Sequence, residues 1–340
     1  SNLVAWAAAD VLIALAASVV VWAVTGPLQA AACGRRGRVA LRRALVVASC
    51  GAGLAAWFLL GWGLNYRRLP LSAQLDHDPA RIDVARVLAV AGEATDQLNA
   101  LHPLAHGEPW LQEADLVVTL ARPFHDALRA TGLPDTIVPG RPKPTLLGPS
   151  LEAAGIAGFT NPFALDVVIV PAALPVERPA LLLHEWAHLA GLAHEADAGF
   201  LGWLAGLRGG PQARYSAWLD LLPRLLAALP EEQARVIRGR LGEGPRDDYR
   251  AIAARLAAIR PVVRDAAWSG YERFLEANRG GGAGGRHGLR RGVDAAPAPM
   301  TAGTPARGRR RARRGVSCSR RSSGGCPRWW SRAARVGRRR

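Results

Sequence analysis

Cysteine is scarce in this chain, and the few cysteines lie near its two ends. Only four occur among 340 residues: Cys33, Cys50, Cys318 and Cys326. Residues 51–317 contain none. A disulfide-rich secreted scaffold needs closely spaced cysteine pairs, so this class of protein is excluded. The middle of the chain must therefore be stabilised by a hydrophobic core, a metal ion or both.

Acidic residues are almost absent from the last part of the chain. Residues 279–340 carry 18 arginines and one acidic residue, Asp294, whereas residues 1–278 carry 26 basic and 26 acidic residues. The net charge of +17 therefore belongs to the tail alone. Because the rest is neutral, we expect no nucleic-acid partner. The Gly- and Arg-rich composition of 279–340, without apolar periodicity, predicts a disordered tail.

Two long apolar runs occur in the first 64 residues. Residues 3–24 are apolar except for Asp10, and residues 44–63 carry no charge. Each run is long enough for a helix to cross ~30 Å of hydrocarbon. A buried core helix would also be apolar, but two such runs around a short basic loop favour transmembrane helices. We therefore predict a two-helix anchor in the lipid bilayer over residues 1–64, with Asp10 at the interface.

The arginines near these runs predict an orientation. Five lie in the loop 25–43 and only two, Arg67 and Arg68, follow the second run. By the positive-inside rule the loop is cytoplasmic, so residues 65–278 would lie on the extracytoplasmic side of the cell membrane. Three aromatic residues stand where an aromatic belt is expected: Trp57, Trp62 and Tyr66.

Residues 65–278 have the apolar periodicity of a soluble, mainly helical domain. A β-branched run at 165–170 is the best strand candidate, and the Pro-, Gly- and Thr-rich residues 132–163 predict an ordered loop. The fold class is thus mainly α, with two transmembrane helices and a helical domain holding a small β element. The predicted helices cover residues 79–101, 108–131, 178–191, 195–208, 212–229, 231–241 and 246–278.

One motif carries chemistry: residues 184–188 are His-Glu-Trp-Ala-His. Histidines four positions apart lie on one face of a helix, so His184 and His188 can bind one ion, typically Zn²⁺. Glu185, beside them, can accept a proton from metal-bound water as a general base. The acidic residue 177 and Pro179 mark the start of this helix, and Gly191 can end it in a left-handed turn.

The third metal ligand has three candidates: His194, Glu195 and Asp197. Residues 184–194 match the metzincin pattern HExxHxxGxxH, but metzincins also need a Met-turn, and the only methionine is Met300 in the tail. The alternative is the two-His, one-Glu site of gluzincins, in which Glu195 on the following helix is the ligand. Trp186 points away from the metal face and is expected in the core.

Several segments, in order along about 40–278, resemble an uncharacterised family of bacterial membrane proteins with a gluzincin-like site. The resemblance implies membrane anchoring, a mainly helical extracytoplasmic domain and a zinc peptidase-like centre, but no known substrate. The family usually has a basic residue where His194 stands, which implies that His194 is not a ligand. The matching segments are GLNYRRLPL (63–71), FTNPFALDVVIVP (159–171), LLHEWAHLAGLAHEADAGFLGWLA (182–205), ARYSAWLDLL (213–222) and YERFLEANR (271–279).

Two functions follow as hypotheses. The first is a membrane-anchored zinc metallopeptidase acting on a peptide or protein, with His184, His188 and Glu195 holding Zn²⁺. The second is a non-catalytic, metal-containing binding or assembly module of the same fold. Tyr215 has a hydroxyl that suits oxyanion stabilisation, although packing is the favoured role. The remaining histidines are expected to be at the surface or hydrogen-bonded: His77, His102, His106 and His125.

Overall fold

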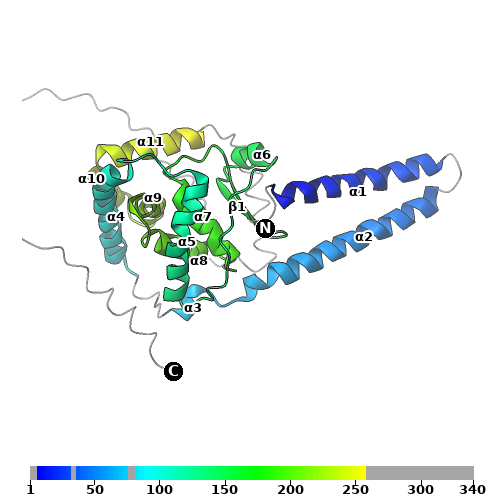
Figure 1. Cartoon of the computed structure of the whole chain (residues 1–340), viewed down its shortest axis with the longest axis horizontal. Helices are drawn as coiled ribbons and strands as arrows, with labels where there is room; N and C mark the ends of the chain where they lie inside the picture. The colour runs from blue at the N-terminus through cyan, green and yellow to red at the C-terminus, as the bar shows by residue number, and fades with distance from the viewer. Residues whose placement is uncertain (1–5, 32–35, 76–77, 79–81, 258–340) are drawn as a thin grey trace, which may run out of the picture. The chain divides into compact units, whose positions relative to one another are not determined.

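Two long apolar helices begin the chain in the computed structural model, which describes residues 6–31, 36–75, 78 and 82–257. Helix α1 (Ala8–Ala31) and helix α2 (Arg36–Gly61) lie side by side (Figure 1). Within these helices, the segments Ala8–Gln29 and Gly37–Gly61 are long and apolar enough to cross a membrane, and only 6% of each is buried. A core helix would be mostly buried, so the prediction of two membrane-spanning helices is supported.

The ends of these helices differ from the predicted spans. Helix α1 continues to Ala31 and α2 already begins at Arg36, so most of the predicted basic loop 25–43 is helical. A helix satisfies its own backbone hydrogen bonds, so it need not end where the apolar run ends. The Arg43 guanidinium lies 4.4 Å from the centroid of the Trp22 ring, where its charge meets an aromatic face. The side of the membrane stays a prediction.

The start of α1 is attached to the segment before helix α6 (Gly148–Ala153). Asp10 accepts hydrogen bonds from Thr145 Oγ1 (2.7 Å) and from the backbone N–H of Leu146 (3.0 Å). The backbone N–H of Ala8 donates to Asp166 Oδ2 at 2.6 Å, and Asp166 forms a buried ion pair with Lys143 at 2.7 Å. Asp10 therefore has hydrogen-bond partners in this segment, and its place at the membrane interface stays a prediction.

Helices dominate the described residues after α2, as the apolar periodicity predicts. The part of the predicted helix 246–278 beyond 257, and the tail 279–340, lie outside the described residues. The elements are η1 (Gly63–Arg67), α3 (Leu71–Gln74), α4 (Val84–Ala105), α5 (Glu113–Ala130), α6 (Gly148–Ala153), α7 (Arg178–Leu189), α8 (Glu195–Gly206), α9 (Pro211–Ala227), α10 (Glu231–Arg240) and α11 (Glu243–Ala257).

A two-stranded antiparallel sheet is the β element of the described residues. Strand β2 (Asp166–Ile169) confirms the strand expected at 165–170, and it pairs with β1 (Gly158–Asn161). The prediction of a loop over 132–163 was wrong at two places, β1 and α6. Strand β1 has only four residues and forms only by pairing with β2, which a local pattern does not show. Val167 in β2 also forms an isolated β-bridge with Pro142 on the side away from β1. Among the described residues, β1 is therefore an outer strand and β2 is not.

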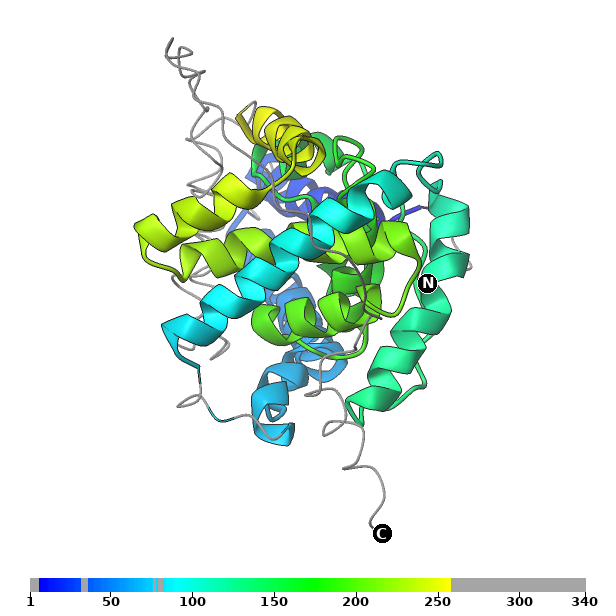
Figure 2. The same ribbon diagram turned by 90° about the vertical axis from the view of Figure 1, so that its left-hand side faces the viewer.

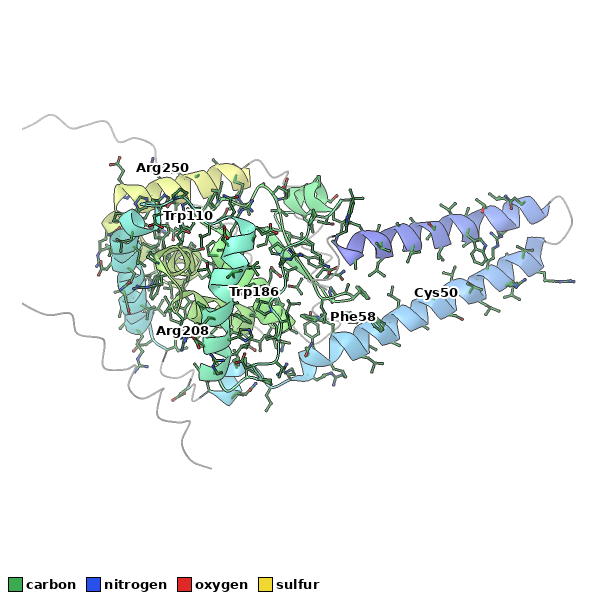
Figure 3. The ribbon with its side chains drawn as sticks, viewed as in Figure 1. Cys50, Phe58, Trp110, Trp186, Arg208 and Arg250 are labelled. Carbon is green, nitrogen blue, oxygen red and sulfur yellow. The ribbon has the colours of Figure 1, made fainter. Side chains whose placement is uncertain are left out.

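Two hydrophobic clusters form the core. The first surrounds Trp186, which is 0% exposed and donates from Nε1 to the Gly140 carbonyl at 2.7 Å, as expected for a core residue (Figure 3). The second lies where α4 and α9 pack along each other (Figure 2), around Leu98 and Leu222. Trp203 on α8 packs against both clusters. Residues of α7 and α8 also pack together in the first cluster.

Candidate metal centre

Helix α7 carries the His-Glu-Trp-Ala-His motif; it begins at Arg178 as predicted and ends at Leu189, two residues before the predicted end. Glu177 is the N-cap, and Pro179 stands in the first turn, where its missing N–H costs nothing. Gly191 follows the helix with φ +85° and donates its N–H to the His188 carbonyl at 2.8 Å. This left-handed turn redirects the chain, so that α8 returns along α7.

The structure brings His184, His188 and Glu195 together. His184 Nε2 lies 3.1 Å from His188 Nε2 and 3.1 Å from Glu195 Oε2, and His188 Nε2 lies 3.7 Å from Glu195 Oε2. Two ligands of a tetrahedral zinc ion, each about 2.0–2.1 Å from the metal, are about 3.3 Å apart. The three atoms fit such an ion, and all lie within 4.8 Å of one another.

Contacts around these side chains orient them. His188 Nδ1 lies 2.7 Å from the Leu192 carbonyl and donates to it, which leaves Nε2 to face the centre. Glu195 is the first residue of α8, and α8 approaches α7 closely at Gly202. A Cβ atom on Gly202 would lie 3.0 Å from the His184 backbone nitrogen. The absence of a side chain there allows α8 to bring Glu195 to the histidines.

The charges of the three groups depend on one another. Burial lowers the pKa of His188, but the hydrogen bond and charge of Glu195, with the charge of Glu185, outweigh burial and raise this pKa to about 9. Burial raises the pKa of Glu195, but the two histidines outweigh burial and hold it well below its usual value. The metal-free centre is therefore an ion pair that a metal cation would replace.

Glu185 is buried beside this centre and points to strand β1. Its side chain is 4% exposed, and Thr160 Oγ1 donates to Oε2 at 2.6 Å. Burial raises the pKa of Glu185, while the charges of His184 and His188 and the Thr160 hydrogen bond act in the opposite direction. This carboxylate thus lies directly beside the histidines, where a general base would be needed.

The other two candidate ligands have different partners. His194 is the N-cap residue of α8, and its ring meets the Tyr66 ring with centroids 6.1 Å apart. Asp197 is buried, and its Oδ2 accepts from the backbone N–H of Leu71 at 3.2 Å, at the start of α3. The geometry thus favours Glu195 as the third ligand. Tyr215 has the packing role, because it is buried in the second core cluster, where its hydroxyl donates to Asp248 on α11.

The sequence interpretation missed that the end of α2 forms part of this site. Phe58, Trp62 and Tyr66 form one buried cluster with Phe163 and Ala193 (Figure 3 labels Phe58). The Trp62 ring centroid lies 6.2 Å from that of His188. The four-residue spacing of these aromatics, which puts them on one helical face, was the available signal. An aromatic belt was predicted instead, and only the tertiary structure shows what this face contacts.

Further contacts hold α2 and the segment after it against the turn between the strands and the end of α7. Arg68 Nη1 donates to the Ala190 carbonyl at 3.2 Å. Trp57 Nε1 donates to the Phe163 carbonyl, in the turn between the strands, at 2.8 Å. The helix expected to leave the membrane thus ends directly at the candidate centre.

Comparisons with known proteins place the chain in a family without giving an activity. No curated protein and no solved structure matches it. The model of a family described as "Protein of unknown function (DUF3810)" matches residues 1–284, which is most of the chain. The sequence resemblance to a membrane-protein family of unknown function is thereby confirmed. The chain belongs to the DUF3810 family.

Proposed function

We propose that the protein is a membrane-anchored zinc metallopeptidase that hydrolyses peptide bonds. The observation that supports this most directly is the convergence of His184, His188 and Glu195 at 3.1–3.7 Å, with the buried Glu185 adjacent in the helix. A purely structural metal site has no use for a general base beside its ligands. The motif and this geometry together suit hydrolysis better than they suit a metal site without catalysis.

The donor set fits Zn²⁺. Two imidazole nitrogens and one carboxylate oxygen are the protein ligands of many catalytic zinc sites, which leave one position open. When bound, zinc would lower the pKa of a coordinated water molecule toward about 7 and polarise the scissile carbonyl. His184 and His188 would act as neutral ligands, with the Nδ1 hydrogen bond of His188 to Leu192 fixing its tautomer.

Glu185 is the residue proposed to move protons. Its carboxylate accepts one proton from the attacking water as the new C–O bond forms, and delivers it to the amine as the C–N bond breaks. Thr160 holds Oε2 by its hydrogen bond, so the group has a fixed position. The raised pKa of Glu185, caused by burial, helps it to hold the proton between the two steps.

The surroundings suggest how a substrate reaches the centre. Strand β1 is an outer strand of the small sheet and touches Glu185 through Thr160. An extended peptide can pair with such an edge through backbone hydrogen bonds. The candidate membrane span Gly37–Gly61 in the structure ends one residue before Trp62, which contacts His188. We therefore propose that the substrate is a polypeptide segment close to the membrane surface, on the extracytoplasmic side.

The test compares purified full-length wild type with Glu185→Gln in lipid nanodiscs containing zinc. The assay uses a peptide library in two forms, one soluble and one attached to the bilayer by an acyl chain. Loss of a general base should lower turnover about 10²–10⁴-fold while zinc content is unchanged. Glu232→Gln, on the exposed face of α10, is the matched control and should retain turnover.

Each outcome has a distinct meaning. Equal turnover of Glu185→Gln and wild type would refute the mechanism. Equal cleavage of the two forms of the library would refute the membrane-proximal substrate. Zinc-dependent folding without cleavage of any peptide would favour the alternative, a non-catalytic metal-containing module of the same fold.

A further inference from the structure

A second cluster of metal-binding side chains lies away from the candidate centre, at the contact of α4, α9 and α11. His102 and His106 are four residues apart at the end of α4, and their rings stack with centroids 4.2 Å apart. Asp248 approaches them from α11, 142 residues further along the chain than His106. One ligand atom from each of these residues lies within 4.8 Å of the others.

We propose that His102, His106 and Asp248 form a second, structural metal site for Zn²⁺ or a similar divalent ion that prefers nitrogen ligands. Asp248 Oδ2 lies 3.0 Å from His106 Nε2 and 3.8 Å from His102 Nε2. These distances bracket the roughly 3.3 Å separation of two ligands around a tetrahedral zinc ion. Two imidazoles and one carboxylate are also a donor set that zinc commonly uses.

A simple hydrogen-bonded histidine–aspartate pair does not account for this arrangement. The 3.8 Å separation between His102 and Asp248 Oδ2 is too long for a hydrogen bond, yet the His102 ring stacks on His106 beside the same carboxylate. Two imidazoles at this distance would repel each other if both were protonated. One shared cation beside the carboxylate satisfies all three groups at once.

The surroundings of the cluster support a built site. The Tyr215 hydroxyl on α9 donates to Asp248 Oδ2 at 2.5 Å and fixes the carboxylate, as residues around metal ligands commonly do. A Cβ atom on Gly244 would lie 2.3 Å from His102 Cε1, so any larger residue there would force the His102 ring to move. The histidine side chains are 26% and 31% exposed, which leaves a path for an ion to enter.

The expected role is to hold α11 in place. Its other end forms a paired contact in which Arg255 donates to both carboxylate oxygens of Glu177, at 2.6 and 3.0 Å. Glu177 is the N-cap residue of α7, the helix of the first centre. A metal ion joining α4 to α11 would therefore stabilise the support of α7. This inference does not depend on the proposed peptidase activity.

Metal stoichiometry tests the proposal. Full-length protein in detergent is stripped with chelator, dialysed against buffered micromolar Zn²⁺, and analysed by mass spectrometry for zinc per chain. Wild type should bind two ions, and His102→Gln/His106→Gln should bind one. His125→Gln is the matched control, because His125 also pairs with an aspartate, Asp135, but no second imidazole joins them in the described part of the chain. This control should still bind two ions.

Thermal unfolding adds a readout that does not depend on counting ions. In the His184→Gln/Glu195→Gln variant, which lacks the first centre, added Zn²⁺ should raise the Tm. The shift should disappear when His102→Gln/His106→Gln is added, and it should shrink in Asp248→Asn. Equal zinc content in wild type and His102→Gln/His106→Gln would overturn the second site. If wild type bound one ion and His102→Gln/His106→Gln bound none, the first centre would hold no zinc. That result would refute the proposed function and not the second site.

Discussion

Metal binding at the first centre should release close to one proton per ion at neutral pH. The hydrogen bond and charge of Glu195, with the charge of Glu185, overcome burial and raise the pKa of His188 to about 9 in the metal-free protein. Because His188 Nδ1 donates to Leu192, the additional proton sits on Nε2, the atom directed at the centre. A metal ion must displace that proton before it can bind.

The magnitude follows from this pKa. Neutral pH lies about two units below 9, so protonation of His188 should weaken the apparent zinc affinity about 100-fold, or about 2.7 kcal/mol. Affinity should rise about tenfold per pH unit up to pH 9 and then level off. The stability of the metal-free protein should change in the opposite direction. A folded-state pKa above the unfolded value of 6.5 stabilises the fold fully below pH 6.5, and this contribution is lost as the pH rises through about 9.

The assay is calorimetric titration with zinc at pH 7.5 in buffers of different ionisation enthalpy, which gives the number of protons released. His102→Gln/His106→Gln is used as the starting protein so that only the first centre contributes. Glu195 is itself a proposed ligand, so its effect on the charge of His188 is tested in the metal-free protein. There Glu195→Gln removes the charge that raises the pKa of His188, and this pKa, followed by NMR, should fall. A proton count near zero when zinc binds, or an unchanged pKa of His188 in Glu195→Gln, would refute the electrostatic reasoning.

Two further substitutions test how the fold supports the site. Lys143→Met leaves the buried Asp166 without its cation and should lower the free energy of unfolding by about 3–5 kcal/mol in denaturant titrations. Asp166→Asn in the same chain should restore much of this loss, and no recovery would contradict the charge argument. Gly202→Ala places a methyl group 3.0 Å from the His184 backbone, so α8 must move and zinc affinity should fall at least about tenfold. Gly199→Ala, whose Cβ would lie 3.8 Å from its nearest neighbour, should bind zinc as wild type does, and equal affinity of Gly202→Ala would show that the close contact does not position Glu195.

Local patterns in the sequence were sufficient for the two long apolar helices and for helix α7 with its His-Glu-Trp-Ala-His motif. Helix formation and hydropathy depend on neighbouring residues, so the apolar runs predicted α1 and α2. The four-residue spacing of His184 and His188 predicted one face of α7, and Gly191 predicted its end. The boundaries near Arg36 were less accurate, because a helix continues past the apolar run when its backbone bonds remain satisfied.

Contacts between distant parts of the chain could not be predicted in this way. His194, Glu195 and Asp197 lie within one helical turn, and only the packing of α8 on α7 separates the residue facing the histidines from the other two. Strand β1 forms because β2 lies beside it. His106 meets Asp248 across 142 residues, and Trp62 meets His188 across the boundary between the anchor and the domain. The sequence by itself determined where the longer helices lie and which face of α7 is polar, since both follow from residues within a few turns. Only the tertiary structure decided which side chains converge, because convergence depends on how each helix packs against partners far along the chain.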